Sequence, residues 1–392
     1  MITGLGILTG PCVGKDDYWS ALTTDHPGPT HRRVEGFNAR DWLDRRHAQR
    51  TALFSQLAVA AGRQAHQDAG SPDDDRDTIA VVLGTGNGGA GTLIQGYLDF
   101  QRGGREAVSL LNGVISMSNA GSANLAFALG SRGVTYSVSS GCTSGTHAVA
   151  DAFRLVRDGL AEVAYGGGSE AGLMTDQPAT DPITATLLNL RVHTEEDVAR
   201  PFDLNRQGFV FSEGAGVVRL ETLDAALRRQ AHIYAEVLGG ANTVDGYDLI
   251  QPSPRGEGLR RCMTLALREA GVDSSEVGHI NCHGTGTKHN DQAESDAAFD
   301  LFGLPGPALN STKAVTGHPG AAAGGVEAVA LALTIDKGLI PQTQWSLTPD
   351  PEITADIVRG TEPRPWEPTV ALSNSVGLGG QNGTLVLAAF TD

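Results

Sequence analysis

Strand-like runs and helical patterns alternate along the whole chain. The strand-like runs are short, and most of them end in glycine, as buried strands followed by tight turns do. They occupy Thr78–Gly84, Ala161–Gly168, Gly214–Glu221, Ile233–Gly240, His279–Gly284 and Gly383–Phe390. Helical patterns fall between them, over Ala52–Ala69, His147–Gly159, Gly258–Ala270, Gln292–Phe302 and Gly320–Lys337. This order of strand, glycine turn and helix predicts an α/β fold with buried sheets.

The second half of the sequence repeats the style of the first. The segment that joins them, Leu223–Gln230 ("LDAALRRQ"), has a helical pattern, and no low-complexity linker interrupts the chain. We therefore predict two halves, residues 1–225 and 226–392, that pack together as one body.

The charge of the chain narrows the choice of partners. The formal net charge of −16 argues against nucleic acid or an anionic membrane as the main partner, because both carry negative charge. One basic cluster stands out, and we interpret it as a solvated face; it consists of Arg32, Arg33, Arg45, Arg46 and Arg50.

The cysteines and the apolar runs indicate the compartment. Cys12, Cys142, Cys262 and Cys282 form no CxxC pair and no Cys/His spacing typical of zinc, so we predict neither a disulfide framework nor a metal site. The opening "MITGLGILTG" lacks the pattern of a signal peptide. The longest apolar-rich run, 320–335, is too short to span a bilayer. We expect a soluble, cytoplasmic protein.

A glycine-rich loop follows the first of the predicted strands named above. "GTGNGGAGT" (Gly84–Thr92) satisfies G-x-G-x-x-G through Gly84, Gly86 and Gly89, a pattern found in nicotinamide-dependent oxidoreductases. Glu106 lies about where an acidic ribose ligand would stand, but no second strand leads to it. The favoured interpretation is a loop that passes close to another segment, with the oxidoreductase as an alternative.

The stretch "VSSGCTSGTHAVADAF" places Cys142 between a strand and a helix that Thr143 or Ser144 is suited to cap. A thiol at that point would feel the helix dipole, which lowers the pKa and favours the thiolate. Two neighbouring backbone N–H groups could also bind an oxyanion. The alternative is a small buried side chain. This stretch alone does not decide whether Cys142 is a nucleophile or a small buried side chain.

The second half supplies candidate partners for that thiol. "NCHGTGTKHND" sets His283 at a strand end, and "NSTKAVTGHPGAAAGGVE" sets Lys313 and His318 before a helix that contains Glu327. Two imidazoles in glycine-rich turns, matched to a cysteine in a similar turn, favour a shared catalytic cleft. We interpret the remaining candidates, His147, His193 and His289, as surface or capping residues. The loop "SNSVGLGGQNG" (Ser373–Gly383) has the glycines of a backbone that approaches a ligand or moves.

These motifs together resemble those of the β-ketoacyl synthases of the thiolase superfamily. The resemblance rests on "GCTSG", "HGTGT", the K-x-x-x-G-H spacing, "RPFDLNRQGFVFSEGAG" and "GLGGQN", in this order and over nearly the whole chain. It implies a five-layered αβαβα fold of two similar halves, usually dimeric. It also places the chain in the elongating branch with two histidines, most like the ketosynthase subunits of type II polyketide systems.

The resemblance implies a role for each site residue. Cys142 would be the nucleophile, and His283 and His318 would stabilise the enolate formed when a malonyl thioester loses carbon dioxide. The backbone N–H groups of Cys142 and Leu378, in the loop with Gly377 and Gly379, would bind the oxyanion. The buried pair Lys313 and Glu327 would orient the histidines, and Thr285 and Thr287 would bind the phosphopantetheine arm of an acyl carrier protein. No cofactor of the enzyme itself is implied.

Three departures from the family pattern stand out. Leu378 occupies the position of a gating phenylalanine, Cys282 replaces the alanine before the active histidine, and the segment around "TTDHPGPTHRRVEGF" is short. The pathway therefore stays open between polyketide and fatty-acid elongation. A homodimer, a heterodimer with a chain-length-factor-like subunit, and a catalytically silent partner subunit also stay open, although Cys142 argues against the last.

Overall fold

The computed structural model describes residues 1–24, 28–172 and 182–391. Six strands form the first sheet, in the order β2-β1-β6-β5-β3-β4. The four central strands are buried along their whole length, which explains why their sequences are apolar or rich in small residues without polar alternation. The strands are β1 (Ile2–Thr9), β2 (Cys12–Val13), β3 (Ile79–Gly84), β4 (Thr135–Val138), β5 (Val163–Glu170) and β6 (Gly214–Glu221).

The second sheet also has six strands, in the order β11-β9-β8-β13-β14-β7. Strand β13 is parallel to β8 and antiparallel to β14, so the turn between β13 and β14 lies at the same edge as the loop after β8. The strands are β7 (Glu236–Val244), β8 (Val277–Asn281), β9 (Ala308–Asn310), β11 (Asp356–Ile357), β13 (Val370–Gly377) and β14 (Gln381–Ala388).

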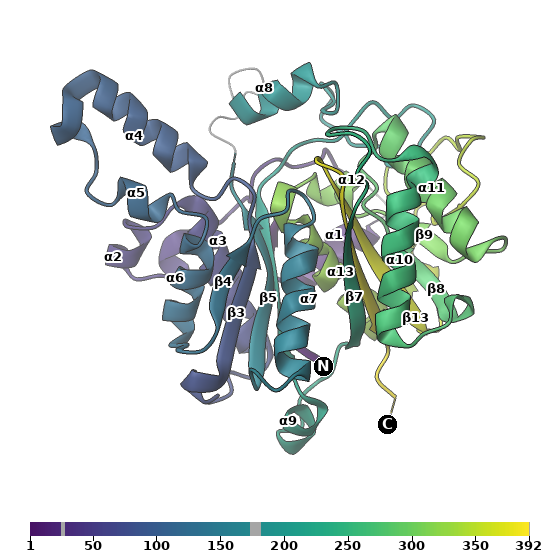
Figure 1. The fold of residues 1–392 in the computed structure, drawn as a ribbon, viewed down its shortest axis with the longest axis horizontal. Coiled ribbons are helices and arrows are strands. Elements are labelled where there is room, and N and C mark those ends of the chain that lie inside the picture. Colours follow the sequence, from purple (N-terminus) through teal and green to yellow (C-terminus); the bar gives the residue numbers. More distant parts are fainter. Residues whose placement is uncertain (25–27, 173–181, 392) are drawn as a thin grey trace.

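Two buried helices separate the sheets, as Figure 1 shows. Helices α7 (Ser144–Arg157) and α13 (Ala323–Lys337) pack against each other and against both sheets. Glycines allow this close packing, because a Cβ on Gly324 would come within 2.1 Å of the Thr146 hydroxyl. A Cβ on Gly325 would lie 2.3 Å from the backbone oxygen of Gly216 on β6, so the run "GAAAGG" allows close contact of α13 with both α7 and the first sheet.

The outer faces of the two sheets are covered by further helices. Helices α3 (Leu53–Asp68) and α6 (Ala120–Leu129) cover the first sheet, while α10 (Glu257–Ala270) and α11 (Lys288–Phe302) cover the second (Figure 1). Helix, sheet, helix, sheet and helix make five layers, which confirms the predicted thiolase-like αβαβα fold. The division of the chain at residue 225 stays a prediction.

The remaining elements are short or peripheral. They are α1 (Lys15–Thr23), α2 (Arg45–Ala48), α4 (Ala90–Gly103), α5 (Asn112–Ile115), α8 (Pro182–Asn189), α9 (Leu223–Arg228), α12 (Lys313–Thr316), β10 (Leu339–Ile340) and β12 (Arg364–Pro365). Short 3₁₀ turns occupy Ala39–Asp41, Arg76–Thr78, Gly104–Ala107, Pro254–Gly256, Ser274–Glu276 and Gly320–Ala322. In the part of the chain that is described, no helix is long and apolar enough to cross a bilayer.

The predicted elements are present, with shifted ends. Helix α7 begins at Ser144, three residues before the predicted start, so Cys142 lies only two residues ahead of it. Neither Thr143 nor Ser144 caps the helix as expected, because both hydroxyls bond within the preceding turn. The predicted helical connection between the halves is present as α9.

Candidate active site

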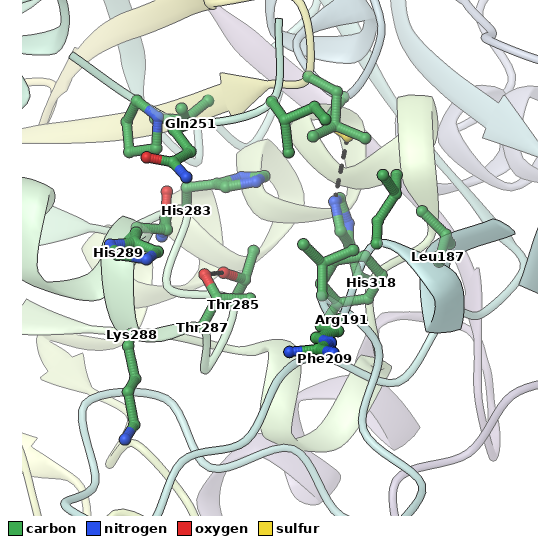
Figure 2. A pocket seen from close by; sticks show the side chains of 18 of the residues that line it. Leu187, Arg191, Phe209, Gln251, His283, Thr285, Thr287, Lys288, His289 and His318 are labelled. Atoms are coloured by element: carbon green, nitrogen blue, oxygen red, sulfur yellow. Dashed lines mark hydrogen bonds between the residues drawn. The ribbon is translucent and has the colours of Figure 1, made fainter. Parts of the chain in front are cut away.

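Three turns meet at a cavity of about 830 Å³, shown in Figure 2. Cys142 comes from the turn before α7, His283 from the loop after β8, and His318 from the loop between α12 and α13. The turn between β13 and β14 adds Gly377 and Leu378 to the lining. The fold therefore brings together the residues that the sequence predicted to share one cleft.

The thiol of Cys142 is in hydrogen-bond contact with His318. Its Sγ lies 3.2 Å from Nε2 of that histidine, and the backbone N–H of Leu378 also donates to the sulfur. Gly377 passes close to the Cys142 backbone, where an added Cβ would lie 3.4 Å from its nitrogen. The loop after β13 thus holds an N–H donor against the thiol, as the predicted oxyanion role for this loop requires.

The pKa of Cys142 is shifted in the direction opposite to the one expected. The helix dipole was expected to lower it, but burial raises the pKa of this thiol to about 11. The positive charge of Lys313 and the N–H of Leu378 act in the other direction and reduce the rise. Desolvation outweighs them, so the resting side chain is the thiol and the thiolate forms only when a bound group or reaction favours it.

The two histidine rings lie edge to face, with centroids 5.0 Å apart and planes at 84°. Burial and then the charge of Lys313 hold the pKa of both well below its usual range, so both rings are neutral near neutral pH. Among the described residues, Nδ1 of neither ring has a hydrogen-bond partner. A proton on Nδ1 would be a buried unpaired donor, so we assign the proton of each ring to Nε2.

Lys313 and Glu327 form a fully buried ion pair. Nζ of Lys313 also donates to the backbone oxygen of His283 at 2.6 Å. Burial raises the pKa of Glu327 to about 7, although the lysine opposes the rise. The pair therefore ties helix α13 to the His283 loop, which agrees with the predicted orienting role for these two residues.

Sequence reasoning missed the residue that fixes the backbone of the His283 loop. The Glu294 carboxylate, on α11, accepts from the N–H of His283 at 2.8 Å and of Gly284 at 2.6 Å. Burial raises its pKa to about 7. Asp291, one helical turn earlier, accepts from the N–H of Phe202 at 2.7 Å. The signal was present as two acids at helical spacing just after "HGTGT", but such acids usually face solvent.

The cavity has a threonine wall and an apolar wall. Thr285 and Thr287 both line it, with hydroxyls 2.9 Å apart (Figure 2). The Phe209 ring packs edge-on against His318, with centroids 4.9 Å apart. Leu378 lines the cavity with 40% of its surface exposed. No motif predicted the apolar lining residues, which include Leu187, Leu190, Leu204, Phe209 and Phe211.

The glycine loop of residues 84–89 binds a carboxylate of this chain. The N–H groups of Gly86 and Asn87 donate to the buried Glu170 at 2.8 and 3.2 Å. A Cβ on Gly84 would lie 2.3 Å from the backbone of Ser144. These contacts support the favoured interpretation, a loop that passes close to another segment, over a dinucleotide site.

Two histidines expected at the surface are buried. His147 bonds Ser140 at 2.8 Å and the backbone oxygen of Asn382 at 3.2 Å, and His193 packs against Phe209. Their burial depends on partners that are distant in the sequence, which is why the sequence alone placed both histidines wrongly. Cys282 is buried in a hydrophobic cluster, and burial raises its pKa well above the usual range. This environment favours packing as its role.

Comparison with known proteins identifies the family. The model of the β-ketoacyl synthase N-terminal domain matches residues 34–226, and that of the C-terminal domain matches residues 234–345. The chain is 36% identical to 3-oxoacyl-[acyl-carrier-protein] synthase 2 of Synechocystis, covering 100% of this chain and 98% of the relative. It is 35% identical to the enzyme of that name from Staphylococcus aureus, covering 91% of this chain and 86% of the relative.

Solved structures agree with this. A chain of the ishigamide ketosynthase/chain length factor superposes with a TM-score of 0.90 at 30% identity, covering 100% of this chain and 98% of that one. A chain from a complex of a type II polyketide acyl-carrier protein with its ketosynthase superposes at 0.88 and 26% identity, covering 99% and 98%. The chain therefore belongs to the β-ketoacyl synthase family of acyltransferases.

Proposed function

We propose that this protein is a stand-alone β-ketoacyl-[acyl carrier protein] synthase of polyketide-type biosynthesis. The observation that carries the proposal is the contact of 3.2 Å between Cys142 Sγ and His318 Nε2, in a cavity that His283 also lines. This arrangement supplies a nucleophile, an N–H donor for an oxyanion and two neutral imidazole donors at one place.

The first step is acyl transfer to Cys142. The sulfur attacks the thioester carbonyl of an acyl carrier protein, and the backbone N–H groups of Cys142 and Leu378 hold the oxyanion. The carrier thiol leaves and takes up the proton that the Cys142 thiol has lost. Burial raises the pKa of the thiol to about 11, and the positive charge of Lys313, the N–H of Leu378 and the N–H of His318 together stabilise the sulfur as it becomes negative.

The second step is decarboxylative condensation. A malonyl thioester loses carbon dioxide, and Nε2–H of His283 and of His318 donate to its carbonyl oxygen as the enolate forms. The enolate carbon attacks the acyl-Cys142 thioester, and Cys142 leaves as a thiolate that solvent reprotonates. Neutral rings suit this role, because the enolate needs hydrogen-bond donors and the low pKa of both histidines keeps one proton on each.

The other predicted residues support these steps. Lys313 and Glu327 position the His283 loop through the lysine bond to the His283 backbone oxygen. Thr285 and Thr287 face the cavity and bind the phosphopantetheine arm, which acts as substrate carrier. The enzyme itself holds no further cofactor in this mechanism.

The assignment of the pathway and of the partner subunit rests on weaker similarity than the assignment of the family does. One of the two structural neighbours described above comes from a type II polyketide system, which favours that pathway. The 36% identity to a 3-oxoacyl-[acyl-carrier-protein] synthase 2 supports fatty-acid elongation as the second candidate. A catalytically silent subunit is disfavoured, because Cys142 and both histidines are present and in contact range.

Exposed apolar side chains support dimer formation. They lie on α4, α5, the segments on either side of α5, α6 and the strand β4, whose outer edge has no strand partner among the described residues. Patches of this kind on a globular protein mark contacts with another protein. The partner is a second copy or a chain-length-factor-like subunit. The exposed residues are Leu93, Tyr97, Phe100, Leu110, Val114, Met117, Phe127 and Tyr136.

Mass spectrometry of the intact protein tests the proposal. After incubation with an acyl carrier protein loaded with an acyl group, we expect an added acyl mass on the wild type and none on Cys142→Ala. Cys262→Ala is the matched control, since that thiol is buried away from the cavity and should leave the adduct in place. Absence of the adduct on wild type, with or without candidate partner subunits, would refute the proposal.

A further inference from the structure

The glutamine after the last glycine turn reaches two backbone carbonyls. Gln381 begins β14 and pairs with Gly377 across the turn, and its side-chain amide lies against the oxygens of Leu378 and Ser140. An amide oxygen on that side would face only acceptors, so we assign the NH2 group to it. The nitrogen then donates to the Leu378 oxygen at 3.3 Å and to the Ser140 oxygen at 3.2 Å. One amide therefore bonds both the turn between β13 and β14 and the turn before α7.

The two carbonyls belong to the segments that carry the proposed oxyanion donors. Cys142 follows Ser140 by two residues, and Leu378 supplies both the bonded carbonyl and the N–H that donates to the sulfur. Neither Ser140 nor Gln381 lines the cavity. The amide thus acts on the donor segments from behind, where it can fix their positions without touching a ligand.

The backbones of these segments approach closely, and a donor between them is needed. A Cβ on Gly141, whose φ is +63°, would lie 3.4 Å from the Leu378 oxygen. Without the amide, the oxygens of Ser140 and Leu378 would face each other with no proton between them. The Ser140 oxygen would keep its bond from the Thr143 hydroxyl, at 2.8 Å. The loss would therefore fall mainly on Leu378, the residue that carries the N–H donor.

A second link holds the base of the same turn. Nδ1 of His147 lies 2.8 Å from the Ser140 hydroxyl, and its Nε2 lies 3.2 Å from the Asn382 oxygen. A carbonyl oxygen only accepts, so Nε2 carries the proton and Nδ1 accepts from the hydroxyl. Burial lowers the pKa of this histidine, so the ring stays neutral near neutral pH. The start of β14 is therefore tied to the turn before α7 even when the Gln381 amide is removed.

We propose that Gln381 is a positioning residue for the oxyanion site of Cys142. Its amide holds the Leu378 peptide against the turn before α7, so that the N–H groups of Cys142 and Leu378 converge on one oxygen. This deepens the proposed function and rests on its acylation step. Removal of an oxyanion donor costs about 10²- to 10³-fold in rate, so a donor that remains but is held less firmly should cost about tenfold.

Two small electrophiles measure the oxyanion site without a carrier protein. With p-nitrophenyl acetate, the Cys142 sulfur attacks the ester carbonyl, p-nitrophenolate leaves, and solvent takes the thiol proton. Iodoacetamide alkylates the same sulfur by displacement of iodide, and no oxyanion forms. The ratio of the two rates at one pH, after subtraction of the rates in Cys142→Ala, therefore reports the oxyanion site and not the amount of thiolate. In the wild type we expect this ratio to exceed that of N-acetylcysteine about hundredfold.

Variants assign the effect to the amide. Gln381→Met keeps the length of the side chain and removes its N–H groups, so the ratio should fall about tenfold. Gln344→Met is the matched control, because that amide also donates to two backbone oxygens, of Ala21 at 2.8 Å and of Leu22 at 3.4 Å, and lies outside the cavity. It should lower stability and leave the ratio unchanged.

Gln381→Glu separates the hydrogen bond from packing. An ionised carboxylate repels both carbonyls, whereas a neutral carboxyl can donate one hydrogen bond. The ratio in this variant should therefore be low when the carboxyl is ionised and should rise as pH is lowered through the carboxyl pKa. The ratio in the wild type should stay constant over the same range.

Four results would overturn the inference. They are a wild-type ratio equal to that of N-acetylcysteine, an unchanged ratio in Gln381→Met, an equal fall in Gln344→Met, and a ratio in Gln381→Glu that does not depend on pH. Failure of acylation by an acyl carrier protein, with all of these ratios as expected, would instead contradict only the proposed function.

Discussion

The turn that holds the thiol and the turn that holds the first histidine are fixed by different kinds of groups. In residues 140–145, the thiol turn, hydroxyls hold the backbone: Ser144 Oγ accepts from the Ser140 N–H at 2.8 Å and donates to the Gly141 oxygen at 2.6 Å. In residues 283–287, the histidine turn, charged groups do so. Glu294 accepts two N–H groups, and Lys313 donates to the His283 oxygen.

The difference suits the form in which each residue would react in the proposed mechanism. There the thiol becomes negative, and neutral hydroxyls fix its turn without opposing that charge. The histidines must stay neutral to donate from Nε2, and the nearby positive charge of Lys313 lowers their pKa. The same lysine also opposes the rise that burial causes in the pKa of Cys142. One buried cation thus favours the reactive form of all three residues.

The largest effect is expected from removing that cation. Lys313→Met leaves Glu327 buried without its partner, and breaking such a pair costs about 3–5 kcal/mol of stability. Chemical denaturation measures the loss. Lys337→Met is the control, since its ion pair with Asp336 is half exposed and worth under about 1 kcal/mol. Equal effects of the two changes would contradict the assigned role of Lys313.

The comparison of the two turns predicts a second, smaller difference. Glu294→Ala leaves two buried N–H donors unpaired and should cost roughly 3 kcal/mol, whereas Ser144→Ala should cost roughly 1 kcal/mol. Denaturation at constant pH compares them. Glu294→Gln keeps a side-chain oxygen as acceptor and should recover part of the loss. A larger loss in Ser144→Ala would reverse the comparison.

Buried carboxyls should make stability depend on pH. Burial raises the pKa of Glu294, and of Glu170 in the first half, to about 7. The folded state then holds protons that the unfolded chain releases near its ordinary pKa of about 4.3. Stability is therefore greatest below that value and falls as pH rises to about 7, by on the order of 2–3 kcal/mol per group.

Denaturation between about pH 5 and pH 8 tests the sign. We expect the stability of the wild type relative to Glu294→Gln and to Glu170→Gln to fall as pH rises, while the buried histidines, whose pKa is lowered, act in the opposite direction in all three proteins. A relative stability that rises with pH, or that does not change, would show that these carboxyls do not titrate as described.

The smallest effect is expected at Leu378. Its side chain lines the cavity, but its contact with Cys142 is made by the backbone N–H. Leu378→Phe should therefore change the preference among acyl chain lengths by about tenfold, the lower end of what one methylene in a hydrophobic pocket is worth. Competition between acyl carrier substrates measures it. A change in iodoacetamide reactivity of Cys142 as large as the change in preference would contradict this separation.

The sequence predicted the layers, and the residues that meet at the cavity, better than the surroundings of those residues. Cys142, His283 and His318 stand in glycine-rich turns after strands or short helices, and such turns meet at one edge of an α/β fold. Glu294 was missed because acids on an amphipathic helix usually face solvent, and burial depends on what packs against α11. The raised pKa of Cys142 was missed for the same reason, since desolvation depends on tertiary packing.

The central claim is that the thiol and the histidines perform separate steps, and measuring both steps in the same variants tests it most directly. Cys142→Ala should lose acylation and keep decarboxylation of malonyl carrier protein. His318→Ala should lose far more decarboxylation than acylation, although it contacts the sulfur at 3.2 Å. If both folded variants lose the two steps equally, the division of roles between the thiol and the histidines is wrong.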